Sequence, residues 1–277
     1  MKKIFALLLT VVLAFSLVFM TSCSGDNTEN GTTGLETLAG KTPEQLYDAS
    51  VEALAMAGSF EVTTESEIIM EMNVSGMQVD VITKQWATSK INGDDSYMKS
   101  GSTSTMMYQD QIVPMGDLNP MEVWYVDGIC YAISNEGKIK GELDKEKFMQ
   151  DYMGKDPQES TLLNLPESWF KDIKFEAAEE GTYVLNMSVS GEEYTEYFGN
   201  VFAGLGYDFT IGDDVIYKIY FDSEGNLTKY TAEFTMSYVI NGVAGTADCT
   251  SVSYVDIKDV AIEAPENADS FQTVQFQ

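Results

Sequence analysis

The feature that most constrains this chain is an alternation of side-chain character from Phe60 to Val74. Even positions are mostly apolar, and odd positions are mostly acidic or polar. A period of two residues places these two sets on opposite faces of a β-strand. The run is much longer than the usual strand of about five or six residues. It therefore predicts a large antiparallel sheet with one apolar face and one acidic face.

Similar alternation, separated by turn signals, predicts further strands along the chain. They begin at Met77 and continue over 97–108, 121–127, 129–134, 171–177, 181–191, 215–221, 227–238 and 243–256. Asn241-Gly242 is the strongest two-residue hairpin signal, and Asp222 to Asn226 predicts a longer turn. Residues 157–170 contain two prolines and fit no single pattern.

Three segments predict helices. Thr42-Pro43-Glu44-Gln45 is a capping sequence that starts the first helix, which ends at Gly58. Asp144 can cap a short second helix. The third, from Glu192 to Leu205, places six large apolar side chains on one face. Long antiparallel strands with a few heavily apolar helices predict one α+β domain, whose sheet curls so that its apolar face wraps the helices.

Composition excludes several classes of function. The chain has 44 acidic residues, 16 basic residues that are all Lys, no His and no Arg, and its net charge is −28. Without His there is no imidazole base or ligand, and without Arg there is no guanidinium clamp for phosphate. The negative charge repels a polyphosphate backbone, so no nucleic-acid partner is expected. We expect a non-catalytic protein without a cofactor or bound metal.

The N-terminus predicts export. Lys2 and Lys3 precede an apolar stretch that is typical of a secretory signal peptide and slightly short for a membrane span of about 20 residues. It ends in Met20-Thr21-Ser22-Cys23, which resembles the lipobox of bacterial lipoproteins. The resemblance implies that residues 1–22 are removed. It also implies that Cys23 carries a diacylglycerol, with acyl chains such as palmitate, at the extracytoplasmic face of the cell membrane. An ordinary signal peptide or an uncleaved anchor is the alternative.

The rest of the chain divides simply. Residues 23–41 comprise the lipid anchor and a polar, Gly-rich flexible tether with a reach of roughly 20–25 Å. A single domain is expected over 42–268, followed by a C-terminal tail over 269–277. Cys130 and Cys249 lie in predicted strands, and in an exported protein they could form a disulfide or remain two buried thiols.

This order of elements is similar to the LolA/LppX-like superfamily of lipoprotein carriers and lipid-binding lipoproteins. The matching features are the helix over 42–58, the strand pair around Glu224-Gly225-Asn226, and the closing segment from Ile262 to Ala268. The resemblance implies a strongly curved antiparallel half-barrel around a few helices, with an apolar cavity between them. Uncharacterised lipoproteins of Gram-positive bacteria with this fold are more similar still. The cavity Arg of many lipoprotein carriers has no counterpart here.

Three patterns suggest chemistry and have simpler interpretations. Ser96 and Lys99 match a serine–lysine spacing, but in a strand they face opposite sides. Adjacent acidic residues, as at Asp94-Asp95 and Asp213-Asp214, are typical of solvated caps rather than glycosidase carboxylates. The turn from Asp222 to Asn226 has calcium-like oxygen spacing but lacks the downstream bidentate acid.

We therefore expect a membrane-anchored protein that binds a lipid or other hydrophobic small molecule in an apolar cavity. The alternative is a packed-core interaction or sensor module for another envelope protein. The side chains expected to line the cavity, which could equally fill an ordinary core, are Ile68, Met70, Met72, Tyr194, Phe198, Phe202, Tyr217, Ile219, Phe221, Phe234 and Met236.

Overall fold

One large sheet dominates the structure. The computed structural model describes residues 37–74, 76–108, 111–152, 169–178, 182–196, 208–240 and 243–276. Its strand order is β13-β6-β5-β4-β3-β2-β1-β12-β11-β10-β8-β7, and β9 pairs with β11 beside this path. The strands are β1 (Ser59–Val74), β2 (Met77–Asn92), β3 (Asp95–Tyr108), β4 (Gln111–Val126), β5 (Ile129–Ser134), β6 (Gly137–Glu142), β7 (Phe170–Ala177), β8 (Tyr183–Val189), β9 (Asp208–Ile211), β10 (Val215–Phe221), β11 (Leu227–Ile240), β12 (Val243–Asp256) and β13 (Gln272–Thr273).

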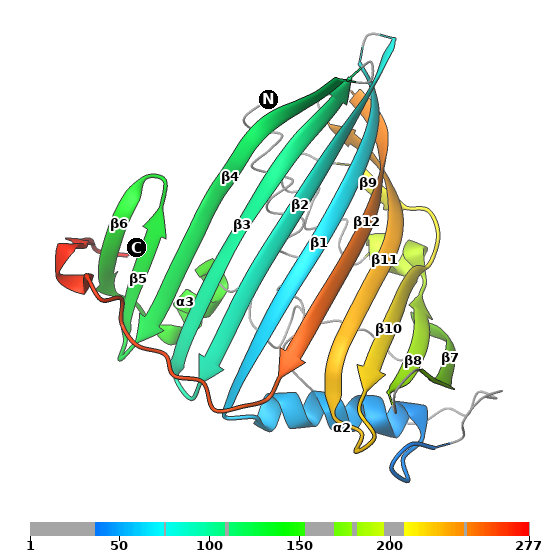
Figure 1. The fold of residues 1–277 in the computed structure, drawn as a ribbon, viewed down its shortest axis with the longest axis horizontal. Coiled ribbons are helices and arrows are strands. Elements are labelled where there is room, and N and C mark those ends of the chain that lie inside the picture. The colour runs from blue at the N-terminus through cyan, green and yellow to red at the C-terminus, as the bar shows by residue number, and fades with distance from the viewer. Residues whose placement is uncertain are drawn as a thin grey trace.

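The sheet is curved and open (Figure 1). Within the described residues, β13 and β7 are its two outer strands and do not pair with each other. Helix α2 (Pro43–Met56) runs along the lower end of the sheet, and α3 (Lys145–Tyr152) lies behind the sheet in this view. The expected curved antiparallel sheet is therefore present, but α2 lies at its end rather than inside its curve.

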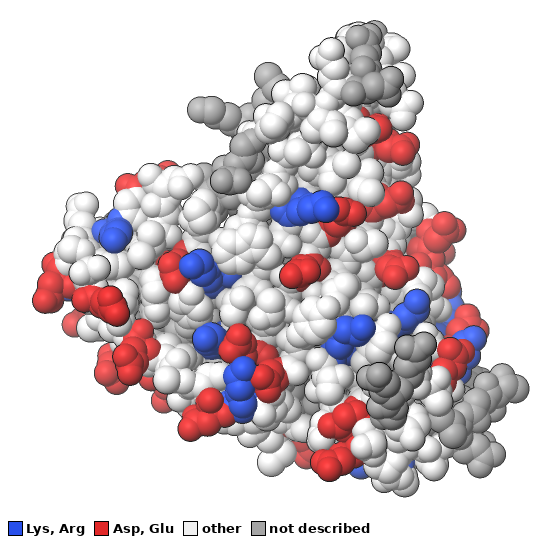
Figure 2. Space-filling view, viewed as in Figure 1, with Lys and Arg blue, Asp and Glu red and all other residues white. Residues whose placement is uncertain are grey.

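The long central strands follow the predicted alternation. β1 pairs with β2 from Ser59↔Asn92 to Val74↔Met77 and with β12 from Glu61↔Asp256 to Met72↔Gly245. Even positions of β1 from Phe60 to Met70 are buried on one face, which we call the inner face. The opposite, outer face carries Glu and Lys side chains and is the one seen in Figure 2.

Helix α2 begins as its sequence predicts. The Gln45 backbone N–H donates to the Thr42 hydroxyl at 3.3 Å, and the Thr42 N–H donates to the Gln45 side-chain oxygen at 3.1 Å. This reciprocal pair satisfies two N–H groups that the helix itself leaves without acceptors. Asp144 likewise accepts from the N–H of Glu146 at 2.9 Å at the start of α3.

Four strands were not predicted in full. β4 begins at Gln111, ten residues before the predicted start at Met121, and β6, β9 and β13 were not predicted at all. The early part of β4 contains Pro114 and Pro120, which weaken a strand pattern because proline cannot donate to the ladder. β6 and β9 are short, and their alternation is too brief to stand out.

The predicted domain limits are too narrow at both ends. Leu38 is buried in the main apolar cluster, so the folded part begins before Thr42. At the other end, residues 269–277 were expected to form a tail. Instead, β13 pairs in parallel with β6, and Phe271 is buried.

The segment between β12 and β13 explains how the C-terminus reaches the far edge. It runs across the lower ends of the long strands (Figure 1). The Asn92 side-chain amide donates to the Val260 carbonyl at 2.8 Å, and the Val260 N–H donates to the Ser59 hydroxyl at 2.9 Å. Lys140 Nζ then donates to the Ala268 carbonyl at 2.8 Å. These contacts fasten strands that are distant in sequence.

Some predictions fall wholly or partly outside the described residues. These are the signal peptide, Cys23, most of the tether, residues 157–168 and the greater part of the helix over 192–205. Residues 191–196 are helical, as predicted for the start of that helix.

Candidate functional site

The inner face carries a band of small polar side chains across the middle of the sheet. In the central cross-strand row, Ser66 of β1 lies opposite Ser251 of β12 and Gln85 of β2, and Gln85 lies opposite Ser102 of β3. In the adjoining rows, the Thr64 and Ser253 hydroxyls are hydrogen-bonded at 2.8 Å, and those of Thr83 and Ser104 at 2.9 Å. We call these eight side chains, together with Ser100, the hydroxyl band. All its members except Ser251 are classed as buried.

Around this band most inner-face side chains are apolar. The main apolar cluster contains Ile68, Met70, Tyr194, Tyr217, Phe221 and Met236 as buried members, and Met72, Ile219 and Phe234 pack against it. The structure thus brings together nine of the eleven side chains expected to line a cavity. Phe198 and Phe202 lie outside the described residues. Whether the nine line a cavity or only fill a core stays a prediction.

Tyrosine hydroxyls introduce polar atoms into this cluster. Burial raises the pKa of Tyr217 well above its usual value, and the hydrogen-bonded hydroxyl of Tyr194 raises it further. Burial likewise raises the pKa of Tyr47 and Tyr230, although hydrogen bonds with Ser253 and Thr64 partly offset the effect at Tyr230. All three phenols are therefore neutral hydrogen-bonding groups at ordinary pH.

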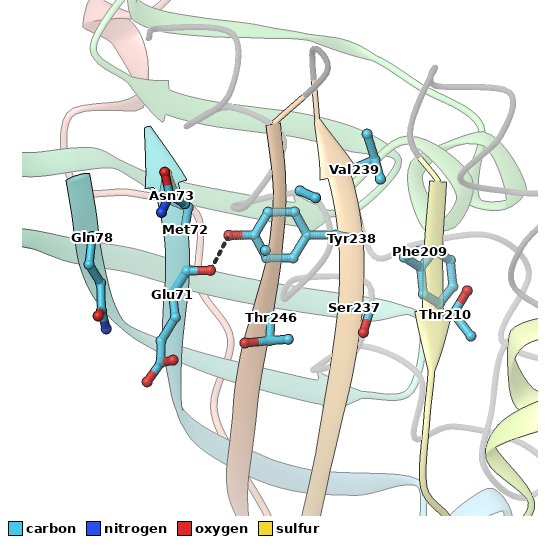
Figure 3. A pocket seen from close by; sticks show the side chains of 12 residues that line it. Glu71, Met72, Asn73, Gln78, Phe209, Thr210, Ser237, Tyr238, Val239 and Thr246 are labelled. Carbon is cyan, nitrogen blue, oxygen red and sulfur yellow. Dashed lines mark hydrogen bonds between the residues drawn. The ribbon is translucent and has the colours of Figure 1, made fainter. Parts of the chain in front are cut away.

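A groove lies where the upper ends of five strands meet (Figure 3). Its volume is about 590 Å³. This falls within the range of roughly 300–1,000 Å³ that is usual for small-molecule sites. Residues from β1 and the start of β2, from β9, and from β11 and β12 line it: Glu71, Met72, Asn73, Gln78, Phe209, Thr210, Ser237, Tyr238, Val239, Ala244, Gly245 and Thr246.

Three groove residues connect it to the apolar interior. Tyr238 is a buried member of the main apolar cluster, and Met72 and Phe209 pack against that cluster. The Tyr238 ring lies across β12, and its hydroxyl donates to the Glu71 carbonyl at 3.4 Å (Figure 3). These three residues therefore place the groove next to the main apolar cluster, and most of its other lining side chains are polar.

Gly245 makes this arrangement possible. It is the cross-strand neighbour of both Tyr238 and Met72. A Cβ atom at this position would collide with the Glu71 carbonyl oxygen and would lie 2.6 Å from Cζ of Tyr238. Only glycine therefore leaves room for the aromatic ring to cross the strand.

The two cysteines are not joined by a disulfide. Cys130 lies in β5 within the cluster around Phe148, and Cys249 lies in β12 within the main apolar cluster. Four strands separate β5 from β12 in the sheet. Both thiols are buried, which decides between the two alternatives left open by the sequence. Burial, with a smaller contribution from Asp248, raises the pKa of Cys249 to about 12.

The patterns that suggested chemistry have structural roles. Ser96 is buried on the inner face of β3, whereas Lys99 is exposed on the outer face, where it pairs with Glu122 at 3.8 Å. Asp94 pairs with Lys145 at 2.6 Å, and Asp214 pairs with Lys171 at 3.4 Å.

The Asp222 carboxylate closes its own turn. It accepts from the N–H groups of Glu224 and Asn226 at 2.8 and 2.9 Å. Burial alone would raise the pKa of Asp222, but these hydrogen bonds lower it overall. Among the described residues, no three His, Cys, Asp or Glu side chains gather as a metal site would require.

Sequence reasoning missed Phe209, Tyr238 and Gly245 as groove residues. Phe209 lies in a strand that the sequence did not predict. Tyr238 was assigned to an apolar strand face, but its role depends on a glycine seven residues later. The hydroxyl band was also missed as a feature, although its period-two Ser and Thr positions in β3 could have indicated it.

The chain shows limited similarity to known proteins. No protein-family model and no curated protein matches the chain. Among solved structures, LprF from Mycobacterium bovis is 11% identical, with a TM-score of 0.29 and coverage of 76% of this chain and 90% of LprF. The translocator domain of autotransporter NalP from Neisseria meningitidis is 7% identical, with a TM-score of 0.25 and coverage of 75% and 92%. A beta-barrel-like DUF1849 protein from Brucella abortus is 10% identical, with a TM-score of 0.21 and coverage of 72% and 99%.

These values do not establish a shared fold. Among the described helices, none has the length and apolar character needed to cross a membrane.

Proposed function

We propose that this protein is a membrane-anchored, non-catalytic lipoprotein that binds an acyl chain or a similar hydrophobic ligand through the groove. The observation that carries the proposal is the continuity between the groove and the main apolar cluster at Met72, Phe209 and Tyr238. An apolar chain that enters there would contact side chains already in the core. The polar rim, with Asn73, Gln78 and Thr246, would remain beside the polar end of such a ligand.

The absence of Arg and His from the chain shapes this proposal. No residue with a buried charge lines the groove, and Glu71 is exposed. Hydrophobic burial would therefore supply most of the binding free energy, at about 25 cal/mol for each Å² of apolar surface removed from water.

Binding of a fluorescent fatty acid to the full chain tests the proposal directly. Replacing Phe209 by Ser removes an apolar wall, and we expect the affinity for the probe to fall about tenfold, because burial of a Phe side chain contributes roughly 1.5–3 kcal/mol. Thr250→Ala changes an exposed polar residue of β12 outside the groove and serves as the matched control. No probe binding by folded wild type, together with no lipid in a mass spectrum of its extract, would contradict the proposal.

The anchor is tested separately. We expect Cys23→Ser to release the protein from membranes or to leave it as an unprocessed precursor, because the lipobox requires the thiol. Globomycin, which inhibits cleavage of lipoprotein signal peptides, should have a matching effect on the wild type. Unchanged processing under both treatments would remove the lipoprotein assignment and leave the groove proposal standing.

One observation favours a second candidate, the interaction module. β4 pairs with β5 only from Glu122 to Val126. Along Gln111 to Met121, no strand within the described residues pairs with the edge of β4 that points away from β3. Ile112 and Val113 are 68% and 41% exposed there. Such an edge can accept a strand from a partner. A photo-crosslinking residue at position 112 would capture such a partner in intact cells, whereas the same residue at exposed Ile257 should not.

A further inference from the structure

The outer face of the sheet carries aromatic side chains that the proposed function does not use. Trp86 of β2 is 40% exposed, although it lies near the middle of the sheet. Tyr97 of β3 and Trp124 of β4 are cross-strand neighbours with ring centroids 5.4 Å apart, and both are partly exposed. Three aromatic rings on one solvent-facing sheet surface make this face a candidate interaction surface.

The indole of Trp86 lies flat on the sheet. Its cross-strand neighbour is Gly101 of β3. A Cβ atom at Gly101 would lie 2.7 Å from Cζ2, 3.0 Å from Cε2 and 3.2 Å from Nε1 of Trp86. Three ring atoms this close to one backbone position mean that the ring covers the glycine. The exposed fraction of Trp86 then belongs largely to the ring face that points away from the sheet.

Most charged groups around these rings are paired with a group of opposite charge. On this face Lys84 pairs with Glu67 at 3.0 Å, Lys90 with Glu61 at 3.7 Å and Lys99 with Glu122 at 3.8 Å. In Figure 2, Lys and acidic side chains are interleaved with uncharged surface over these strands. A ligand matched in charge to this surface is uncharged, and the large negative charge of the whole chain disfavours an anionic one.

Polar groups beside the indole complete the arrangement. Glu65 lies directly opposite Trp86 on β1, is exposed, and has no ion pair among the described residues. Its carboxylate can accept hydrogen bonds from ligand hydroxyls. The face therefore offers a flat ring, an acceptor next to it, and a second aromatic pair farther along the same strands.

We propose that the outer face of β1 to β4 binds a neutral polysaccharide, with one sugar ring stacked on Trp86. A pyranose ring presents a face of C–H groups, and the slightly positive hydrogens match the negative face of an aromatic ring. Its hydroxyls point outward toward Glu65 and the paired lysines. Tyr97 lies opposite Lys90, which follows Trp86 by four residues on β2. The distance between Trp86 and this position along the strand is therefore roughly 13 Å, at about 3.3 Å per residue. An oligosaccharide of a few rings spans that distance.

Calorimetric titration of the full chain with cellohexaose and with chitohexaose tests this proposal. We expect at least one of them to bind, and Trp86→Ala to weaken it about tenfold or more through lost stacking and burial. Trp86→Tyr retains an aromatic face and should bind within about threefold of wild type. Gly101→Val should weaken binding as Trp86→Ala does, because the new side chain displaces the indole while the Trp remains.

Ile216→Ala is the matched control. Ile216 is also 40% exposed and lies on the outer face of β10, in the other part of the sheet. Its replacement should leave oligosaccharide affinity unchanged. If Trp86→Ala or Gly101→Val does not fold, acrylamide quenching of wild-type tryptophan fluorescence provides a second measurement, since bound ligand should shield Trp86.

Three results would overturn the proposal. These are no binding of either oligosaccharide, binding that is equal in wild type and Trp86→Ala, and tighter binding of anionic polygalacturonate than of the neutral ligands. Binding of cellohexaose alone would indicate a hexose polymer, and binding of chitohexaose alone would indicate an N-acetylhexosamine polymer. Because these tests concern the outer face, they are independent of fatty-acid binding at the groove.

Discussion

The inner face of the sheet is built in two different ways. On β8, β10 and the upper part of β11 it carries large apolar and aromatic side chains, including Phe221, Tyr217 and Met236, which are buried together. On β2 and β3, the same face of the same sheet carries Thr83, Ser100 and Ser104, which are equally buried. We call the first region the aromatic wing and the second the hydroxyl wing, which contains the β2 and β3 members of the hydroxyl band. Burial in this sheet is therefore set by side-chain alternation and not by hydrophobicity alone.

The difference between the wings has an energetic meaning. Apolar side chains stabilise the aromatic wing through surface removed from water and through close packing. Buried hydroxyls contribute little net free energy when they are hydrogen-bonded and cost more when one partner is lost. The aromatic wing should therefore dominate the free energy of unfolding, while the hydroxyl wing should depend on its pairs.

The largest expected effect comes from truncating the aromatic wing. Phe221 is fully buried and packs edge-to-face on Phe175, with ring centroids 6.2 Å apart. Phe221→Ala should lower the free energy of unfolding by about 3–5 kcal/mol, measured by urea denaturation. Tyr254→Ala, at a position 51% exposed, should change it by less than about 0.5 kcal/mol. A loss for Phe221→Ala as small as that of the control would contradict the division into wings.

Alkaline pH should act on the titratable side chains buried in the apolar interior, because the hydroxyl band itself contains none. Burial raises the pKa of Cys249 to about 12. Its value in the unfolded chain is about 8.5. Between about pH 9 and pH 12 the unfolded state binds fewer protons at this thiol than the folded state, so stability falls as pH rises.

The slope from this one group is on the order of 1.4 kcal/mol per pH unit. Urea midpoints from about pH 8 to about pH 11 measure it. Tyr217 and Tyr230, whose pKa values burial also raises, should steepen the decline above about pH 10. Cys249→Ala should flatten the decline between about pH 9 and pH 10, and an unchanged profile in that variant would show that the thiol ionises while folded.

The hydroxyl wing should respond to the loss of one hydrogen-bonding partner. Thr83 and Ser104 are buried, and their hydroxyls are 2.9 Å apart. Ser104→Ala or Thr83→Val alone should cost about 1–2 kcal/mol, because each leaves a buried hydroxyl without this partner. The double variant should cost clearly less than the sum of the two. Strict additivity in urea denaturation would mean that the pair does not act as a unit.

The smallest effect is expected on the outer face. Lys84 and Glu67 are 3.0 Å apart, but their side chains are 69% and 38% exposed. Lys84→Ala should change the free energy of unfolding by less than about 0.5 kcal/mol, because water and salt screen the pair. Repeating the measurement in high salt should make the small difference vanish. A loss as large as that of a buried hydroxyl pair would place the outer face among the stabilising regions.

Local rules made much of the sheet predictable. β1, β2, β3 and β12 were expected because their alternation is long, and the start of α2 was expected because Thr42 and Gln45 form a capping box. β4 was predicted only from Met121, because Pro114 and Pro120 obscure its first half. The C-terminal residues were taken for a tail because a two-residue strand has no detectable period.

The candidate site was less accessible to sequence reasoning. Nine of the expected cavity side chains do gather in one cluster, since eight lie on strand faces that alternation identifies and Tyr194 lies on the predicted apolar face of a helix. The groove was not expected. It needs β9 beside β11, and it needs Gly245 beneath Tyr238, and neither relation leaves a periodic signal along the chain.

The sequence by itself determined the faces of the long strands, the capped start of α2 and the sites of the tight turns. These features depend on neighbours within a few residues, where backbone sterics and side-chain alternation act directly. Only the tertiary structure decided that β1 pairs with β12, that β13 crosses to β6, and that five strands from three parts of the chain form a groove. Those pairings join residues more than a hundred positions apart, and they arise from burying whole sheet faces together rather than from any local preference.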